Sequence, residues 1–419
     1  MLTIYKYVIY LLIPLIKINL SIRIKKNKEE KSRIKERFGK SNKLRPKGNL
    51  IWIHAASVGE FNSATGLINI LLKKNKILIT TNTVTAYYYC KKIFGNKIIH
   101  QYAPIDHAPW VKRFIEHWSP KLVIWIESDL WPNTMGVISQ KNIKSVLLNL
   151  RISPKSFERW AISKQSFSKI LDYFNEVFAQ SKNDLKKIKN LTSRKIKYVG
   201  NLKLTSLPIK INKNNFLKIK KITASKKIIL IASTHHNEEN LILKSINKTL
   251  SLNKNLIVLI IPRHPNRSLE VLKVVKKFIP ESSLLSNYKS KFKLKCLIIN
   301  SLGEMSIYYK ICEIVILGGS FVDMGGHNPI EPAKLNCSIL TGPSIYNWQN
   351  IYEEMSKNNA CFVCKSEKEL RKNFNIILKN NRLKKRLMKN ALRYSKQNQS
   401  ILKDILKTIN PLLKGIKNA

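Results

Sequence analysis

The chain has 419 residues, which is longer than one hydrophobic core normally serves, so two domains are expected. Hydrophobic residues make up 44% of it, which is ample for folded domains and excludes a largely disordered chain. Lysine and arginine outnumber aspartate and glutamate by 76 to 25, and the net charge of +51 suits a nucleic acid, an anionic membrane or a phosphorylated substrate. However, Lys, Ile and Asn are frequent throughout the chain, as a genome rich in A and T would produce. Drift of the composition on a solvated surface therefore explains the excess of positive charge equally well, and the charge alone does not identify a function.

An apolar stretch, YVIYLLIPLI at residues 7–16, opens the chain between Lys6 and Lys17. It is shorter than the ~20 apolar residues of a transmembrane helix, and no small-residue cleavage site follows it. The basic residues over 23–47 favour the cytoplasmic side of a membrane and anionic lipid. We therefore expect a membrane anchor over residues 1–22, either spanning or interfacial, and a basic juxtamembrane segment over 23–48. The alternative is an ordinary helix packed on the first domain.

Short apolar runs alternate with helical stretches in the first predicted domain, residues 49–208. These runs are unbroken rather than alternating, which indicates strands covered on both faces and hence a parallel sheet. The candidate strands are Leu50–His54, Ile77–Thr80, Lys97–Tyr102, Leu122–Ile126, Ser145–Leu148, Val177–Ala179 and Ile196–Val199.

A polar, lysine-rich stretch from Asn201 to Lys227 contains the predicted linker, residues 209–227, with room for one helix. The strand–helix pattern restarts over residues 228–385, and residues 386–419 form a basic helical tail. The candidate strands of this second domain are Ile228–Ala232, Leu256–Ile261, Leu297–Asn300, Ile314–Leu317, Ser338–Thr341 and Cys361–Val363. Two successive α/β units predict two Rossmann-like domains, each binding ligands at the carboxyl ends of its strands.

The segment GGSFVDMGGHNPIEPA, residues 318–333, follows the apolar run Ile314–Leu317. Glycines let a backbone approach a ligand closely, and Pro329 suits the first turn of a helix whose free amides favour an anion. The carboxylate of Glu331 is able to accept hydrogen bonds from both hydroxyls of a ribose. This pattern favours a phosphate site, although a purely structural turn would use the same residues.

Polar residues also follow three other predicted strands. Glu60, in AASVGEF, is either a general base or a favourable charge at a helix N-terminus. Glu127 and Asp129 occur in ESDLWPN, after the strand that ends at Ile126. Arg263, in PRHPNR, is suited to a forked contact with phosphate, or is simply one more surface arginine of a basic protein.

The six cysteines are scattered, and several lie in apolar runs. Cys361 and Cys364 form a CxxC pair, but no second pair completes a zinc site. We expect six reduced, mostly buried thiols and no structural metal. The cysteines are Cys90, Cys296, Cys312, Cys337, Cys361 and Cys364.

Taken together, these segments resemble the Kdo transferases of Gram-negative bacteria, which attach 3-deoxy-D-manno-octulosonic acid (Kdo) to a lipid A precursor. Each motif is weak by itself, but their shared order over nearly the whole chain, apolar N-terminus included, is specific. The motifs are IWIHAASVGE (51–60), TTNTVTA (80–86), YAPID (102–106), ESDLWPN (127–133), LNLRISPKS (148–156), AQSKNDL (179–185), VGNLKL (199–204), ASTHHNEE (232–239), IPRHPNR (261–267), LGEM (302–305) and GGHNPIEPA (325–333).

The resemblance implies a GT-B glycosyltransferase fold, in which two Rossmann-like domains face each other across a central cleft and the second domain binds the donor nucleotide. It places the family's proton acceptor at Glu60 and its transition-state-stabilising positions at Glu127 and Lys203. The positions that it implies for CMP binding are Pro262, Arg263, Leu302, Gly303, Glu304, Asn328, Pro329, Ile330 and Glu331.

The same resemblance implies that Kdo passes from CMP-Kdo to a lipid A precursor (lipid IVA), with release of CMP and inversion, at the cytoplasmic side of the inner membrane. No DxD-type metal motif is evident, so we expect neither a metal nor another cofactor. The expected partners are CMP-Kdo, the acceptor lipid and the membrane lipid surface, and no nucleic acid.

The chain departs from the family's usual pattern at three places. Ala86 stands where the family usually has Gly, Asp129 stands where Glu is commoner, and Leu204-Thr205 stand where an Asp usually follows soon after Lys203. These departures concern acceptor binding more than donor binding. The alternatives are a GT-B transferase for another nucleotide sugar, a basic nucleic-acid-binding protein, and a degraded family member without activity. Against the nucleic-acid alternative, aromatic residues are not interleaved with the basic runs and no recognised module occurs.

Overall fold

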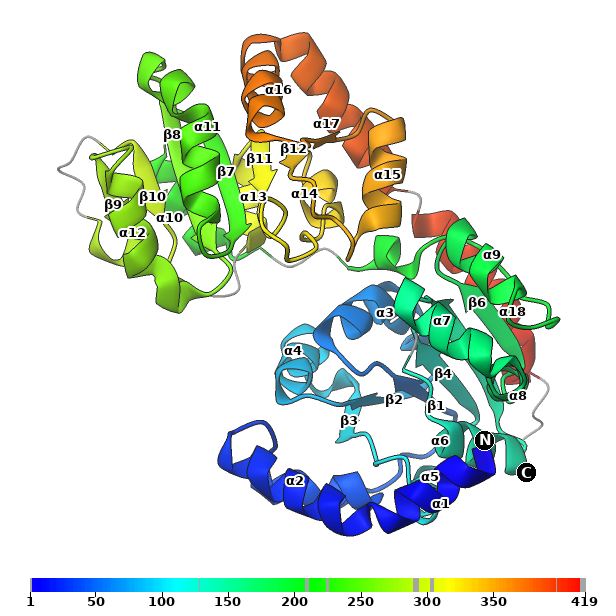
Figure 1. Ribbon diagram of the computed structural model, residues 1–419. Coiled ribbons are helices and arrows are strands. Elements are labelled where there is room, and N and C mark those ends of the chain that lie inside the picture. The colour runs from blue at the N-terminus through cyan, green and yellow to red at the C-terminus, as the bar shows by residue number, and fades with distance from the viewer. Residues whose placement is uncertain are drawn as a thin grey trace. The chain divides into compact units, whose positions relative to one another are not determined.

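The computed structural model describes residues 2–127, 129–207, 211–223, 226–288, 294–301, 305–396 and 398–414. The chain divides into two compact units (Figure 1). Unit 1 comprises residues 1–207 and 398–419, and unit 2 comprises residues 208–397. Each unit has its own parallel sheet and its own hydrophobic core, which confirms the α/β prediction.

In the described part of unit 1, six strands form a parallel sheet in the order β3-β2-β1-β4-β5-β6. The central strands β1 and β4 are buried at every residue, as their unbroken apolar runs predict. Their carboxyl ends lie side by side, because Ile53 of β1 pairs with Ile124 of β4. The strands are β1 (Leu50–His54), β2 (Lys76–Thr81), β3 (Ile99–Tyr102), β4 (Leu122–Ile126), β5 (Lys144–Leu150) and β6 (Glu176–Ala179).

Helices pack on both faces of this sheet (Figure 1). The core is rich in tryptophan: Trp52, Trp118 and Trp125 are almost fully buried, and the rings of Trp52 and Trp125 lie 5.8 Å apart, edge to face. The helical segments of unit 1 are α1 (Leu2–Leu11), α2 (Ile13–Lys25), η1 (Lys31–Phe38), α3 (Val58–Leu71), α4 (Val84–Phe94), η2 (Gly95–Lys97), α5 (Ala108–Trp118), α6 (Pro132–Gln140), α7 (Pro154–Ile162), α8 (Lys164–Asp172), α9 (Lys182–Lys189), η3 (Leu202–Thr205) and α18 (Asn398–Lys414).

Unit 2 repeats this architecture, with seven described strands in the order β13-β12-β11-β7-β8-β10-β9, all parallel. The strands are β7 (Lys227–Thr234), β8 (Leu256–Pro262), β9 (Ser282–Leu284), β10 (Cys296–Ile298), β11 (Ile314–Leu317), β12 (Ser338–Thr341) and β13 (Phe362–Val363). The helical segments are α10 (Lys213–Ile222), α11 (Glu238–Leu252), η4 (Pro265–Arg267), α12 (Ser268–Lys276), η5 (Leu285–Asn287), α13 (Met305–Ile311), α14 (Ile330–Lys334), α15 (Gln349–Lys357), α16 (Glu367–Lys379) and α17 (Asn381–Ser395).

Three differences from the predicted elements have physical causes. The predicted strand Ile196–Val199 forms only a single bridge, between Lys197 and Phe178, while Ile196 packs into the core. The predicted strand Lys97–Tyr102 begins at Ile99, because a 3₁₀ turn precedes it. Strand β9 was not predicted, because it is an edge strand that contains two serines.

The basic tail predicted over residues 386–419 covers two helices that pack in different units. Helix α17 packs on β12 and α14 of unit 2, whereas α18 packs on η3 of unit 1. The second helix of the tail therefore contributes to the unit that holds the N-terminal sheet.

The N-terminal apolar stretch forms two helices, α1 and α2, that meet at a bend of 61°. Among the described residues, no single helix has both the length and the hydropathy of a membrane span, and α1 and α2 meet those conditions only as a pair. Pro14 lies in the first turn of α2, where its missing amide donor costs no helical hydrogen bond.

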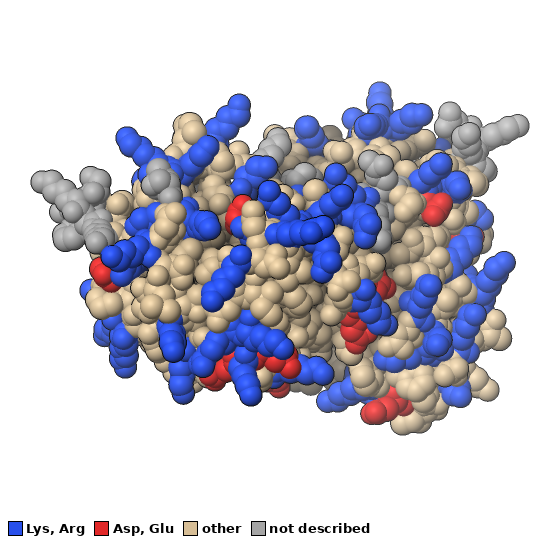
Figure 2. Space-filling model, turned by 90° about the horizontal axis from the view of Figure 1, so that it is seen from above, with Lys and Arg blue, Asp and Glu red and all other residues tan. Residues whose placement is uncertain are grey.

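Basic side chains are spread over the visible face of the molecule rather than gathered in one groove (Figure 2). On that face, acidic side chains are few and also scattered. On this face, the positive charge is therefore a general property of the solvated surface.

Candidate active site

Glu60 lies in the first turn of α3, directly after the central strand β1. Its amide donates to Ser57 Oγ at 3.3 Å, while its carboxylate accepts from Ser57 Oγ at 3.3 Å and from the Ala56 amide at 2.7 Å. This arrangement is a variant of the capping box, in which the carboxylate reaches the amide one residue before the N-cap Ser57, so the carboxyl group helps to begin the helix. It also stands at the carboxyl edge of the sheet, where parallel α/β sheets bind their ligands.

The electrostatic surroundings of Glu60 suit proton transfer. Burial raises the pKa of the Glu60 carboxyl to about 8, and the negative charge of Glu127 adds to the effect. The hydrogen bond from the Ala56 amide opposes the rise. A group whose pKa lies near the working pH is both available as a base and strong enough to take a proton.

Glu127 directly follows β4 and has a left-handed backbone, with φ of 63°. A non-glycine residue in this region costs about 1–3 kcal/mol and persists only where its surroundings hold it. Here the Glu127 amide donates to the Leu148 carbonyl at 2.9 Å, and Asn149 Nδ2 donates to Glu127 Oε1 at 3.2 Å. Such strain is concentrated at functional sites.

Lys203, in η3, lies beside Glu127: its Nζ is 3.5 Å from Glu127 Oε1, and both side chains are largely buried. Asn201 caps η3 by accepting from the Lys203 amide at 3.0 Å, and Asn149 Oδ1 accepts from the Leu202 amide at 3.0 Å. Asn149 therefore positions both the carboxylate and the turn that carries the lysine. The sequence did not single out Asn149, because an asparagine inside an apolar strand carries no signal of which residues it will bridge.

A second asparagine that the sequence did not single out, Asn82, follows β2. Its Nδ2 donates to Asp129 Oδ2 at 3.1 Å, and its amide donates to the Ala56 carbonyl at 3.0 Å. Asp129 is in turn held by β4, because Trp125 Nε1 donates to its carbonyl at 2.7 Å. Burial raises the pKa of Asp129, and its charge contributes to the raised pKa of Glu60. The unit 1 site thus contains three carboxylates and one lysine from three segments, the start of α3, the turn after β4 and η3.

In unit 2, Pro262 is the last residue of β8 and Arg263 follows it. The Arg263 amide donates to the Thr234 carbonyl at 2.9 Å, which fixes the backbone at the carboxyl end of β7, while the side chain is exposed. Burial lowers the pKa of His235 and of His327, and the positive charge of Arg263 adds to both shifts.

His235 and His327 form a stacked pair with rings 8° from parallel and Nε2 atoms 3.0 Å apart. Burial, together with His235 and Arg263, lowers the pKa of His327 to about 4. His327 is therefore neutral near pH 7. The sequence marked His327 only as a residue of the glycine-rich turn and did not select His235, because their contact joins segments 92 positions apart.

The helix predicted behind Asn328 and Pro329 is present as α14. Asn328 Oδ1 accepts from the Ile330 amide at 2.9 Å, and Glu331 Oε1 accepts from Ser306 Oγ at 3.1 Å. Burial raises the pKa of the Glu331 carboxyl, while Ser306 and Lys334 oppose the rise. These residues lie at the carboxyl edge of the unit 2 sheet, after β11.

Most of the amides in the glycine-rich segment are bound by protein groups rather than left for an anion. Glu238 is fully buried, and its carboxylate accepts from the amides of Gly319, Ser320 and Phe321 at 2.7–2.9 Å. Further along, the Gly325 amide donates to Ser344 Oγ and the Gly326 amide to the Gly319 carbonyl. The amides of Gly325 and Gly326 therefore have internal acceptors in this structure.

Leu302, Gly303 and Glu304, which the sequence places in the nucleotide site, lie outside the described residues. All six cysteines are buried thiols, as expected. In the ranges that the structure describes, no three His, Cys, Asp or Glu side chains are grouped as a metal site would require.

Comparison with known proteins connects this geometry to a family. Residues 32–206 match the family model described as 3-deoxy-D-manno-octulosonic-acid transferase (kdotransferase). A 3-deoxy-D-manno-octulosonic acid transferase of Rickettsia bellii is 33% identical over 423 residues, covering 98% of this chain and 99% of that protein. The protein of the same name from Haemophilus influenzae is 30% identical over 418 residues, covering 96% of each.

Solved structures support the fold. The UDP-GlcNAc 2-epimerase of Neisseria meningitidis matches with a TM-score of 0.61 at 13% identity, over 87% of this chain and 100% of that one. A glycosyltransferase of Rickettsia africae matches with a TM-score of 0.59 at 15% identity, over 88% and 100%. The two parallel Rossmann-like units are those of a GT-B-like fold. The near-complete match to the curated relatives carries the assignment further: the chain belongs to the 3-deoxy-D-manno-octulosonic acid transferase family.

Proposed function

We propose that the protein transfers Kdo from CMP-Kdo to a hydroxyl of a lipid A precursor and releases CMP. The observation that carries this proposal is the group formed by Glu60, Glu127 and Lys203 at the carboxyl edge of the unit 1 sheet, in a chain of this family. A partly buried carboxyl group with a pKa of about 8 beside a lysine–carboxylate pair is equipped to deprotonate an alcohol and to meet an anionic sugar.

Glu60 takes the proton from the acceptor hydroxyl as that oxygen attacks the anomeric carbon of Kdo. The Glu127 carboxylate assists by disfavouring the ionised form of Glu60 before reaction, which strengthens the base. Lys203 supplies a positive charge for one of the two anionic groups of the donor, the sugar carboxylate or the phosphate. Attack opposite to the departing CMP inverts the anomeric configuration.

The donor nucleotide binds unit 2 through Pro262, Arg263, Leu302, Gly303, Glu304 and the segment Asn328 to Glu331. Arg263 pairs with the phosphate, whose negative charge grows as the glycosidic bond breaks. Glu331 accepts hydrogen bonds from the ribose. Neutralisation by arginine and lysine is sufficient for a monophosphate leaving group, so we propose that transfer requires no metal.

The helices α1 and α2 hold the protein at the cytoplasmic face of the inner membrane, where its amphiphilic acceptor resides. Apolar side chains on α1 are exposed, among them Leu11 at 79%, and lysines and arginines follow on α2 and η1. Exposed apolar surface flanked by basic residues is typical of interfacial attachment to anionic lipid.

The test is transfer by the purified full chain with CMP-Kdo and lipid A precursor, followed by mass spectrometry of the product with a chelator present. We expect addition of Kdo by the wild type and loss of at least about 100-fold in rate for Glu60→Gln, since general-base catalysis contributes about 10²–10⁴-fold. CMP affinity should remain nearly unchanged. Glu116→Gln, an exposed carboxylate of the same unit, is the matched control.

Turnover with a UDP-sugar but none with CMP-Kdo would instead support a transferase for another nucleotide sugar. Full activity of Glu60→Gln, or weaker CMP binding without a loss of rate, would reject the base assignment. Activity lost with the chelator and restored by a divalent ion would reject metal independence.

A further inference from the structure

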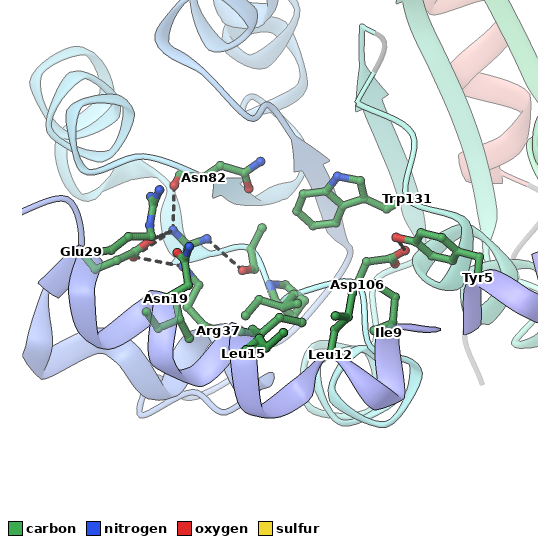
Figure 3. A pocket seen from close by; sticks show the side chains of 16 residues that line it. Tyr5, Ile9, Leu12, Leu15, Asn19, Glu29, Arg37, Asn82, Asp106 and Trp131 are labelled. Carbon is green, nitrogen blue, oxygen red and sulfur yellow. Dashed lines mark hydrogen bonds and ion pairs between the residues drawn. The ribbon is translucent and has the colours of Figure 1, made fainter. Parts of the chain in front are cut away.

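A cavity of about 550 Å³ lies in unit 1 between the helices α1 and α2 and the carboxyl edge of the sheet (Figure 3). Its volume is within the ~300–1,000 Å³ of small-molecule sites. The helix side of its lining is mainly apolar, with Ile9, Leu12, Leu15, Ile16 and Leu20. The sheet side consists of the loop 103–106 after β3, together with Asn82 and Trp131.

The two helices are tied to unit 1 by polar contacts at both ends of the cavity (Figure 3). At one end, Tyr5 Oη donates to Asp106 Oδ2 at 2.9 Å. At the other, Glu29 accepts from Arg23 at 3.0 Å and from Arg37 at 2.9 Å, and Arg37 also donates to the Asn82 carbonyl at 2.7 Å. Between these contacts the helices present apolar side chains to the cavity, so the space is shaped for an apolar chain.

The sheet side of the cavity leads to the proposed base. Asn82, which lines the cavity, donates its amide to Ala56, and the Ala56 amide binds the Glu60 carboxylate. The side-chain nitrogen of Asn82, Nδ2, donates a hydrogen bond to Asp129, and this bond fixes the orientation of the side-chain amide and hence of its acceptor oxygen, Oδ1. This oxygen is shielded from solvent, and no donor for it occurs among the described residues.

The outer face of α1 is also apolar, with Ile4 66% and Tyr7 64% exposed. The helix pair therefore has apolar side chains both outward and toward the cavity, as expected of a segment between a lipid phase and a largely apolar cavity. We propose that the cavity binds one acyl chain of the lipid acceptor and thereby places the polar head of that lipid at Asn82 and Glu60. This inference rests on the proposed transferase function, because the acceptor is the lipid that the site must reach.

The test compares Ile16→Trp, which fills the cavity from α2, with Ile18→Trp, a change two positions away at a side chain that is 57% exposed and does not line it. Equilibrium binding of radiolabelled acceptor, in acylated and chemically deacylated forms, is measured without donor in detergent. We expect Ile16→Trp to weaken binding of the acylated form at least tenfold and to leave the deacylated form unchanged. Ile18→Trp should behave as wild type with both. Acceptors with shortened chains should lose about fourfold in affinity per methylene withdrawn from the cavity.

Equal binding of the acylated acceptor by the two variants would overturn the cavity assignment, as would equal affinity of the wild type for acylated and deacylated acceptors. If Ile16→Trp also loses binding of the deacylated acceptor, the same measurement is made on Ile9→Trp, which fills the cavity from α1. Selective loss of the acylated form in Ile9→Trp would show a blocked cavity and attribute the Ile16→Trp result to misfolding, whereas unchanged binding of both forms would overturn the cavity assignment. Transfer from CMP-Kdo is measured separately on the same samples. Binding with the expected selectivity but no transfer would reject the proposed function and leave the acyl site standing.

Discussion

At the scale of single residues, the site depends on side chains whose properties are set by neighbours distant in sequence. Glu60 has an ordinary helix-capping geometry, yet burial and Glu127 raise its pKa to about 8. Lys203 belongs to a short 3₁₀ turn and gains its significance from the carboxylate 3.5 Å away.

The raised pKa of Glu60 predicts the pH dependence of the reaction. Only the ionised carboxylate takes a proton, so kcat/KM for transfer should rise with pH and reach half of its plateau near pH 8. Glu127→Gln removes the charge that contributes to the rise, and the midpoint should move to lower pH. If kcat/KM of the wild type instead reached half of its plateau near pH 4.5, Glu60 with its raised pKa would not be the titrating base.

The raised pKa of Glu60 also predicts how the stability of the protein changes with pH. Because the folded pKa of Glu60 is above its unfolded value, the folded state holds the proton between about pH 4.5 and 8, and the unfolding free energy falls as pH rises through that window. Glu60→Gln should therefore melt a few degrees above the wild type at pH 8.5 and close to it at pH 5. Calorimetry at both values measures this difference, and a lower melting temperature at pH 8.5 would contradict it.

Arg263 is the residue on which donor binding is expected to depend most. A charge-assisted hydrogen bond is worth about 1.5–3 kcal/mol, so Arg263→Ala should weaken CMP binding about 10–100-fold. Titration calorimetry with CMP measures the effect. Lys254→Ala, an exposed cation just before the other end of β8, is the control, and equal affinities of the two variants would remove Arg263 from the phosphate site.

At the scale of elements, the glycine-rich loop after β11 is held by one carboxylate. Glu238 begins α11 and accepts the amides of Gly319, Ser320 and Phe321, as well as that of His235. The Glu238 carboxylate thus holds the first part of this loop, and the proposed nucleotide contacts at Asn328 to Glu331 lie beyond it.

Glu238→Ala should destabilise the protein, because it leaves buried amides without an acceptor, at a cost of about 1–3 kcal/mol for each one that stays unpaired. We expect the unfolding free energy to fall by roughly 3 kcal/mol and CMP affinity to fall as the loop loses its shape. Urea unfolding and CMP titration measure both. Glu353→Ala, an exposed carboxylate of the same unit, should change neither, and wild-type stability of Glu238→Ala would contradict this account.

At the scale of the whole molecule, the N-terminal helices should serve attachment more than folding. Deleting residues 1–20 removes Tyr5 and its bond to Asp106 but leaves the Arg23–Glu29–Arg37 cluster and both sheets. We expect sedimentation with anionic vesicles to fall several-fold while circular dichroism and CMP binding persist. An unfolded product would instead favour a helix pair that is an integral part of the first domain.

The net charge of the molecule comes mainly from exposed side chains, whereas the charged groups of the unit 1 site are partly or largely buried. Basic side chains are dispersed over the face in Figure 2, whereas Lys203 is largely buried in a pair with Glu127. Exposed charges are screened within about 10 Å at ordinary ionic strength, and buried ones much less. The net charge of +51 therefore bears on association with anionic surfaces rather than on the chemistry.

The sequence by itself determined the parallel α/β units, because buried strands must be apolar on both faces, and it determined the family through motifs in a fixed order. It also marked Glu60, Arg263 and Glu331, since charged residues in the segments that follow such strands stand at the ligand-binding edge. Only the tertiary structure decided that Asn149 joins Glu127 to η3, that Glu238 binds the glycine-loop amides, and that a cavity separates α1 and α2 from the sheet. These features depend on contacts between residues far apart in the chain, and local residue patterns hold no information about which distant groups will meet.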